Sequence, residues 1–94
     1  MARPVLIIED DPDISESLKY NLEREGLSTV VAATGEQGLI EALNERNSPI
    51  LIVLDLMLPF LGGMAVCRAI RRQGLNRDAP ILILTARQDE TDKV

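Results

Sequence analysis

The sequence predicts an α/β fold, in which a doubly wound parallel sheet carries helices on both faces. Short, continuous apolar runs recur along the chain, as expected for strands that are buried on both faces of a parallel sheet. Segments with the apolar spacing of helices separate these runs, which gives the order β-α-β-α-β-α-β with right-handed crossovers. No internal repeat or linker interrupts the pattern, so we interpret residues 1–94 as one domain.

Four segments are predicted as strands. Three are apolar throughout and have a proline just ahead of them or at their start (Pro4, Pro49, Pro80), where the missing N–H of proline is tolerated. The remaining one is weaker and follows Gly26. In chain order, the predicted strands are Val5–Ile8, Thr29–Ala32, Ile50–Leu54 and Ile81–Leu84.

Helices are predicted between the strands. The first runs from about Asp13 to Glu25 and stops at Gly26, and the second begins at a capping box, Thr34–Gln37. The third covers about Met64–Gln73 after the turn Gly62-Gly63, and Asp89–Val94 begins a fourth. The predicted inward stripes are Ile14, Leu18 and Leu22, then Leu39, Ala42 and Leu43, and finally Met64, Cys67 and Ile70.

The composition excludes several classes of function. The net charge is −5 and no basic run exceeds Arg71-Arg72, so we expect this segment to bind neither nucleic acid nor an anionic membrane surface. The apolar runs are far shorter than the ~18 residues of a membrane span, and no signal peptide is visible. The chain has no histidine, which excludes serine-type triads and the usual zinc sites. Its single cysteine excludes an intrachain disulfide and fits a cytoplasmic location.

Polar and charged residues gather where the predicted strands end. They are Glu9, Asp10 and Asp11 after the first strand, Asp55 after the third, and Thr85 and Ala86 after the fourth. Sheets of this kind place their sites at the carboxyl ends of the strands. If the first and third strands are neighbours, their carboxylates converge and repel one another unless a cation lies between them. Mg²⁺ suits such a site, because it binds one or two carboxylates and keeps waters and phosphate oxygens as further ligands.

Some of these acids have a purely structural alternative. Asp11 or Asp13 caps the first helix, with a proline in its first turn, and we favour that role for both. Glu9 and Asp10 are solvated loop acids in the same view. For Glu9, Asp10 and Asp55 together we favour metal binding, because an ionisable residue that ends a buried strand needs compensation.

Three motifs resemble the receiver domain of bacterial two-component response regulators: Val5–Asp11, Ile52–Pro59 and Pro80–Arg87. The resemblance is closest to the winged-helix transcription-regulator branch, which includes the phosphate-starvation regulator. It implies a flavodoxin-like sheet with strand order 2-1-3-4. The fifth strand and last helix of the family are absent from this chain, which stops nine residues after Thr85, and we interpret it as a receiver truncated after the fourth strand.

The resemblance also implies a role for each site residue. Asp55 would accept a phosphoryl group from a sensor histidine kinase, with the Thr85 hydroxyl and the Ala86 backbone N–H in contact with that group. The Mg²⁺ ligands would be Asp10 and Asp55 directly, Glu9 through water, and the backbone carbonyl of Met57. The chain would act as a phosphorylation switch that controls an output domain outside this segment, a DNA-binding one by resemblance, and not as an enzyme with a turned-over substrate.

Two other functions stay open. A hydrolase of the haloacid-dehalogenase type also uses a strand-end aspartate and Mg²⁺, but it carries a second aspartate two residues later, where this chain has Met57. An interaction scaffold that needs no phosphorylation is the other alternative, because the lysine that the family carries on its fifth strand is missing. Were these residues the whole polypeptide, the exposed edge of the fourth strand would favour a homodimer or a strand-exchanged oligomer.

Overall fold

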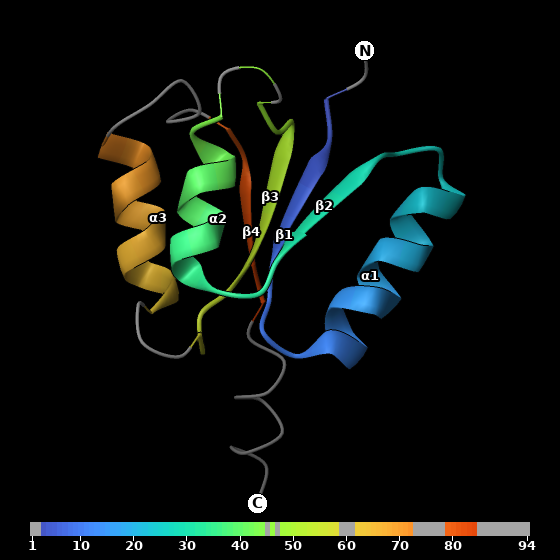
Figure 1. The fold of residues 1–94 in the computed structure, drawn as a ribbon, viewed down its shortest axis with the longest axis horizontal. Coiled ribbons are helices and arrows are strands. Elements are labelled where there is room, and N and C mark those ends of the chain that lie inside the picture. The colour runs from blue at the N-terminus through green and yellow to red at the C-terminus, as the bar shows by residue number, and fades with distance from the viewer. Residues whose placement is uncertain (1–2, 45, 47, 59–61, 73–78, 85–94) are drawn as a thin grey trace, which may run out of the picture.

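The structure, a computed structural model, describes residues 3–44, 46, 48–58, 62–72 and 79–84. These residues form a four-stranded parallel sheet with the strand order β2-β1-β3-β4. Helix α1 lies on one face of the sheet and helices α2 and α3 lie side by side on the other (Figure 1). The elements are β1 (Val5–Ile8), α1 (Pro12–Arg24), β2 (Thr29–Ala32), α2 (Gly35–Ala42), β3 (Leu51–Asp55), α3 (Gly63–Arg72) and β4 (Ile81–Leu84). The predicted fold class and strand order are confirmed, and the predicted helix Asp89–Val94 lies outside the described residues.

Strands β1, β2 and β4 have the predicted bounds, whereas β3 is shifted by one residue. The β1–β3 pairing starts with Val5 opposite Leu51, which leaves Ile50 outside the strand. At the other end, Asp55 pairs with Leu84 of β4. Asp55 is therefore the last residue of the strand itself, and its backbone is held by the sheet.

Each face of the sheet has its own core. The larger core lies under α2 and α3, and its buried members are Leu6, Ile8, Ala32, Ala42, Ile52, Leu54, Leu58, Val66 and Ile70. The smaller core lies under α1 and joins Val5, Ile7 and Val53 to the half-buried Leu18 and Leu22 of that helix. Alternate strand residues thus point to opposite faces, as the period of a strand requires.

Burial on both faces was predicted for the three continuous apolar strands and is wrong for β4. The side chain of Leu82 is 55 % exposed. It pairs with Val53 and so lies on the α1 face of the sheet. Among the described elements α1 packs against β1 and β2, at the far side of the sheet from β4. A continuous apolar run does not distinguish a central strand from one at the edge of the described sheet.

The ends of α1 and α2 follow from local hydrogen bonds. Asp11, and not Asp13, is the N-cap of α1: its Oδ1 accepts from the Asp13 N–H at 2.9 Å. Gly26 follows α1 with a φ of 89°, a left-handed conformation that favours glycine. Thr34 caps α2 by accepting from the Gln37 N–H at 3.1 Å, but the Gln37 side chain donates to Glu41 instead of accepting from the Thr34 N–H. Only half of the predicted capping box forms.

The predicted inward stripe of α3 is wrong at one position. Val66 and Ile70 are buried and Cys67 packs against the larger core, but Met64 is 51 % exposed. The buried stripe begins instead at Gly63, three residues before Val66. Because successive helical residues are about 100° apart, Met64 points away from the sheet.

Candidate metal centre

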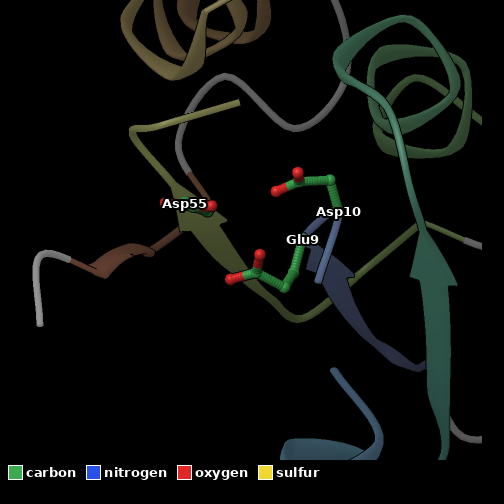
Figure 2. A group of neighbouring side chains, drawn as sticks. All are labelled: Glu9, Asp10 and Asp55. Atoms are coloured by element: carbon green, nitrogen blue, oxygen red, sulfur yellow. The ribbon is translucent and has the colours of Figure 1, made fainter. Parts of the chain in front are cut away.

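Three carboxylates meet at the carboxyl edge of the sheet. Glu9 and Asp10 follow β1, and Asp55 ends the neighbouring strand β3. Each side chain offers an oxygen, and these oxygens all lie within 4.8 Å of one another. Figure 2 shows the three side chains directed into the space between the ends of the two strands. The structure therefore brings together three of the residues that the sequence places in one site.

The backbone explains why these side chains converge. In the β1–β3 register Ile8 lies opposite Leu54. The next residues along the two strands, Glu9 and Asp55, therefore lie at the same height of the sheet. The Glu9 N–H donates to the Ala32 carbonyl at 3.0 Å and continues the pairing of β1 with β2 beyond Ile8. Because Glu9 keeps the strand alternation, its side chain falls on the same face as that of Ile7.

Two of the three carboxylates are almost fully buried. Glu9 is 2 % exposed and Asp55 is 1 % exposed, whereas Asp10 is exposed. The Asp11 N–H donates to Glu9 Oε2 at 3.0 Å, and the Met57 N–H donates to Asp55 Oδ1 at 2.9 Å. These backbone donors stabilise the negative charge of each carboxylate, but they do not remove the repulsion between neighbouring charges. A cation between the carboxylates would offset this repulsion.

The donor set fits a hard divalent cation. All three side chains provide carboxylate oxygens, which Mg²⁺ prefers, and none provides the sulfur or imidazole nitrogen that favours zinc or copper. Among the described residues, this is the one group of three or more acidic, cysteine or histidine side chains close enough to hold a metal. Mg²⁺ also keeps waters and phosphate oxygens in its coordination shell, so an exposed Asp10 beside buried partners leaves a side open to solvent.

The other predicted site residues are placed only in part. Met57 lies beside Asp55 through its backbone hydrogen bond, and its side chain is 51 % exposed. Thr85 and Ala86 lie outside the described residues. Leu84, which precedes Thr85, pairs with Asp55.

Gly63 belongs to this site and was missed as such. The predicted turn Gly62-Gly63 is half correct, because Gly63 is the first residue of α3 and is buried. A Cβ at position 63 would lie 2.5 Å from the carbonyl oxygen of Asp55. The Gly62-Gly63 pair was the feature of the sequence that could have revealed this role. Glycine is needed at position 63 because the backbone there contacts the backbone of Asp55 in the candidate metal centre.

Comparison with known proteins identifies the family. A family model described as the response regulator receiver domain matches residues 5–94. The chain belongs to this family. Receiver domains of two-component response regulators act in phospho-signalling, bind Mg²⁺ at an acidic pocket and interact with sensor histidine kinases. They are not classical enzymes.

Two curated relatives are transcriptional regulators. The chain is 46 % identical over 94 residues to the alkaline phosphatase synthesis transcriptional regulatory protein PhoP of Bacillus subtilis, which covers 100 % of the chain and 38 % of that protein. It is 48 % identical over 90 residues to the transcriptional regulatory protein AfsQ1 of Streptomyces coelicolor, which covers 96 % of the chain and 38 % of that protein. This receiver domain thus spans well under half the length of these relatives.

Solved structures share the fold. The receiver domain of sensor histidine kinase PA1611 from Pseudomonas aeruginosa PAO1, with a magnesium ion coordinated in its active site cleft, gives a TM-score of 0.83 at 30 % identity, covering 99 % of this chain and 75 % of that one. A sensor protein from Polaromonas sp. JS666 gives a TM-score of 0.80 at 33 % identity, and the match covers 96 % of this chain and 72 % of that one. None of the helices in the described part of this receiver domain has the length and apolar character of a membrane span.

Proposed function

We propose that this receiver domain is a Mg²⁺-dependent switch in which Asp55 accepts a phosphoryl group from the phosphohistidine of a sensor histidine kinase. One observation carries the proposal: the carboxylate oxygens of Glu9, Asp10 and Asp55 lie within 4.8 Å of one another, at the carboxyl edge of two neighbouring parallel strands. Of these acids Asp55 is the one that belongs to a strand, and it pairs there with Leu84 of β4.

The metal ligands in this proposal are Asp10 and Asp55 directly, Glu9 through water, and the Met57 backbone carbonyl. Bound Mg²⁺ would neutralise charge on the phosphoryl oxygens. The burial of Glu9 and Asp55 supports the assignment, because two buried carboxylates this close gain most from a shared cation. The exposure of Asp10 supports access for the metal from solvent.

The chemical step is a displacement at phosphorus. A carboxylate oxygen of Asp55 attacks in line, an O–P bond forms, and the N–P bond to the kinase histidine breaks. The Met57 N–H holds Oδ1 of Asp55 at 2.9 Å and so orients the nucleophile. We assign contacts with the phosphoryl oxygens to the Thr85 hydroxyl and the Ala86 N–H, on the family resemblance.

The output of the switch lies elsewhere in the protein. The relatives that the chain matches are named as transcriptional regulators, and it covers 38 % of their length. We therefore propose a DNA-binding output domain outside this segment. Because the net charge is −5 and no basic run exceeds Arg71-Arg72, we expect no direct DNA binding by this segment.

Uptake of label from a small phosphodonor tests the proposal. The chain is incubated with radiolabelled acetyl phosphate, with Mg²⁺ or with EDTA. We expect stable label only with Mg²⁺, and none in Asp55→Asn. Glu16→Gln, which removes an exposed carboxylate of α1 outside the cluster, should take up label as the wild type does.

Other outcomes would favour the alternatives. Continuous release of inorganic phosphate without stable label would favour a hydrolase. Absence of label under every condition would favour an interaction scaffold that needs no phosphorylation.

A further inference from the structure

Helices α2 and α3 carry opposite charges on the same face of the sheet. The charged residues of α2 are both acidic, Glu36 and Glu41, whereas those of α3 are all basic, Arg68, Arg71 and Arg72. The two helices lie side by side over the larger core (Figure 1). An acidic helix and a basic helix therefore adjoin on one surface of the protein.

The two helices do not neutralise each other within one copy. In the part of the chain that the structure describes, no ion pair links Arg68 or Arg72 to a carboxylate of α2. Arg71 is engaged elsewhere, because its Nη1 donates to a backbone carbonyl ahead of β4 at 2.7 Å. Glu36, Arg68 and Arg72 are exposed to solvent, and Glu41 is half-buried. These charges thus remain accessible to a partner.

An apolar side chain lies at the centre of this surface. Ile40 is on α2 between Glu36 and Glu41, and its side chain is 62 % exposed. A single exposed isoleucine is ordinary on a protein surface. Here, however, it is surrounded by charges, and an apolar centre with a charged rim is the usual composition of a protein–protein interface.

The order of the charges along the helices is self-complementary. Because all strands are parallel and each helix returns to the start of the next strand, α2 and α3 run in the same direction. A twofold axis parallel to these helices turns a second copy toward the first and places α2 of each copy opposite α3 of the other, again in parallel. A twofold axis across the helices would instead place each helix opposite its own copy, with like charges together.

The spacing of the charges also matches. Glu36 and Glu41 are ~7.5 Å apart along the axis of α2, and Arg68 and Arg72 are ~6 Å apart along that of α3. Glu36 of one copy therefore meets Arg68 of the second copy where Glu41 meets Arg72. The twofold axis forms each of these pairs twice.

We propose that the α2–α3 face, defined by Glu36, Ile40, Glu41, Arg68 and Arg72, is a docking surface for a second copy of this chain. Two short helices on each side make a small interface, so the dimer is weak and depends on protein concentration. It differs from the strand-exchanged association expected from the sequence, which would use the edge of β4. It also does not depend on phosphorylation of Asp55, so it goes beyond the proposed function.

Exchange of one charge pair tests the interface. Glu36→Arg brings arginines together at positions 36 and 68, and Arg68→Glu brings glutamates together there, so each variant alone should be monomeric. Mixed in equal amounts, the two variants restore opposite charges at both contacts, and the mixture should regain the association of the wild type. Sedimentation equilibrium over a range of protein concentrations measures each sample.

The salt dependence and the apolar centre are tested on the same samples. Raising NaCl from ~0.05 M to ~0.5 M should weaken the association several-fold, because exposed ion pairs are screened. Ile40→Ser should weaken it about tenfold through the loss of apolar burial. Tyr20→Ser is the matched control: Tyr20 is 64 % exposed but lies on α1, on the other face of the sheet, and we expect the association of the wild type.

The inference is overturned by any of three results. The first is a wild type that stays monomeric up to ~1 mM. The second is association that persists in both Glu36→Arg and Arg68→Glu, which would favour the edge of β4. The third is a mixture that stays monomeric although urea unfolding shows both variants to be folded. Uptake of label at Asp55 decides the proposed function separately, whichever result is found.

Discussion

Gly63, the first residue of α3, lies directly against the backbone of Asp55, the last residue of β3. A Cβ at position 63 would lie 2.5 Å from the Asp55 carbonyl oxygen and 2.6 Å from the Cα of Leu56. Backbone atoms at the end of a paired strand and in the turn that follows it cannot move aside as the end of a side chain can. The contact therefore requires glycine, and it fixes where α3 begins relative to the candidate metal centre.

Gly63→Ala should destabilise the fold and disturb the site together. Alanine favours a helix by ~1 kcal/mol over glycine, but forcing a methyl group into close packing costs roughly 1–3 kcal/mol. The strain falls on the Asp55 peptide, so we also expect weaker Mg²⁺ binding. Urea unfolding and a Mg²⁺ titration measure the two effects.

The neighbouring glycine is the control. A Cβ at Gly62 would meet nothing within 4 Å, so Gly62→Ala should leave both measurements close to those of the wild type. Equal unfolding midpoints for the Gly62 and Gly63 variants would show that the contact with Asp55 does not limit the packing of α3.

Gly38 of α2 makes a comparable contact with a side chain. A Cβ there would lie 2.6 Å from Cδ1 of Ile8, on β1. Gly38→Ala should lower the free energy of unfolding by roughly 1–3 kcal/mol, because the larger core has to shift. Ile8→Val removes the nearest atom, so the double variant should lose less than the sum of the single losses. Glu36→Ala, at an exposed position of the same helix, is the control, and strictly additive losses would contradict the contact.

The strands could be predicted from the sequence because their signal is local. Short apolar runs, three of them just after a proline, mark the strands, and three of the four predicted strands have the observed bounds. The order of the strands is not local, and it came from the family resemblance. The exposure of Leu82 was missed for the same reason, since a strand carries no local mark of what packs on each face.

The residues of the candidate site also differ in whether the sequence could predict them. Glu9, Asp10 and Asp55 could be predicted, because carboxylates at the ends of neighbouring parallel strands must meet. The role of Gly63 could not, because it depends on the position of the α3 axis over the sheet. Met64 was placed inward because a spacing of three residues was read as one stripe, although six residues turn a helix by about 600° and leave Met64 about 120° away from Ile70.

The three close carboxylates should destabilise the metal-free protein. In EDTA, Asp55→Asn should raise the free energy of unfolding by roughly 1–3 kcal/mol, because it removes one of the repelling charges. Mg²⁺ at ten times its Kd should stabilise the wild type by about 1.4 kcal/mol, and Asp55→Asn much less. Urea unfolding with and without Mg²⁺ measures both effects.

Glu16→Gln is again the matched control, because it removes an exposed carboxylate outside the cluster and should leave the Mg²⁺ effect intact. A wild type with the same stability in Mg²⁺ and in EDTA would contradict a metal site at these residues.

Glu23 joins α1 to β2 and gives the fold a predictable dependence on pH. Its Oε2 accepts from Lys19 Nζ at 3.0 Å and from Thr29 Oγ1 at 2.8 Å. The hydrogen bond from Lys19, followed by that from Thr29, lowers the pKa of Glu23 below its ordinary value of 4.5. A carboxyl group with a lower pKa in the folded state stabilises the fold fully above the unfolded pKa, and this contribution is lost as pH falls through the folded pKa.

Glu23→Gln should therefore be less stable than the wild type at neutral pH, and the difference should close as the pH falls below 4.5. The effect is small and salt-sensitive, because both charged side chains of the pair are about half exposed. Urea midpoints at several pH values measure it. Thr29→Val removes the hydroxyl, which donates to Glu23 and accepts from Lys19, but keeps the hydrogen bond between Lys19 and Glu23, and it should show a smaller difference of the same sign. A difference between Glu23→Gln and the wild type that stays constant with pH would mean that ionised Glu23 does not stabilise the contact of α1 with β2.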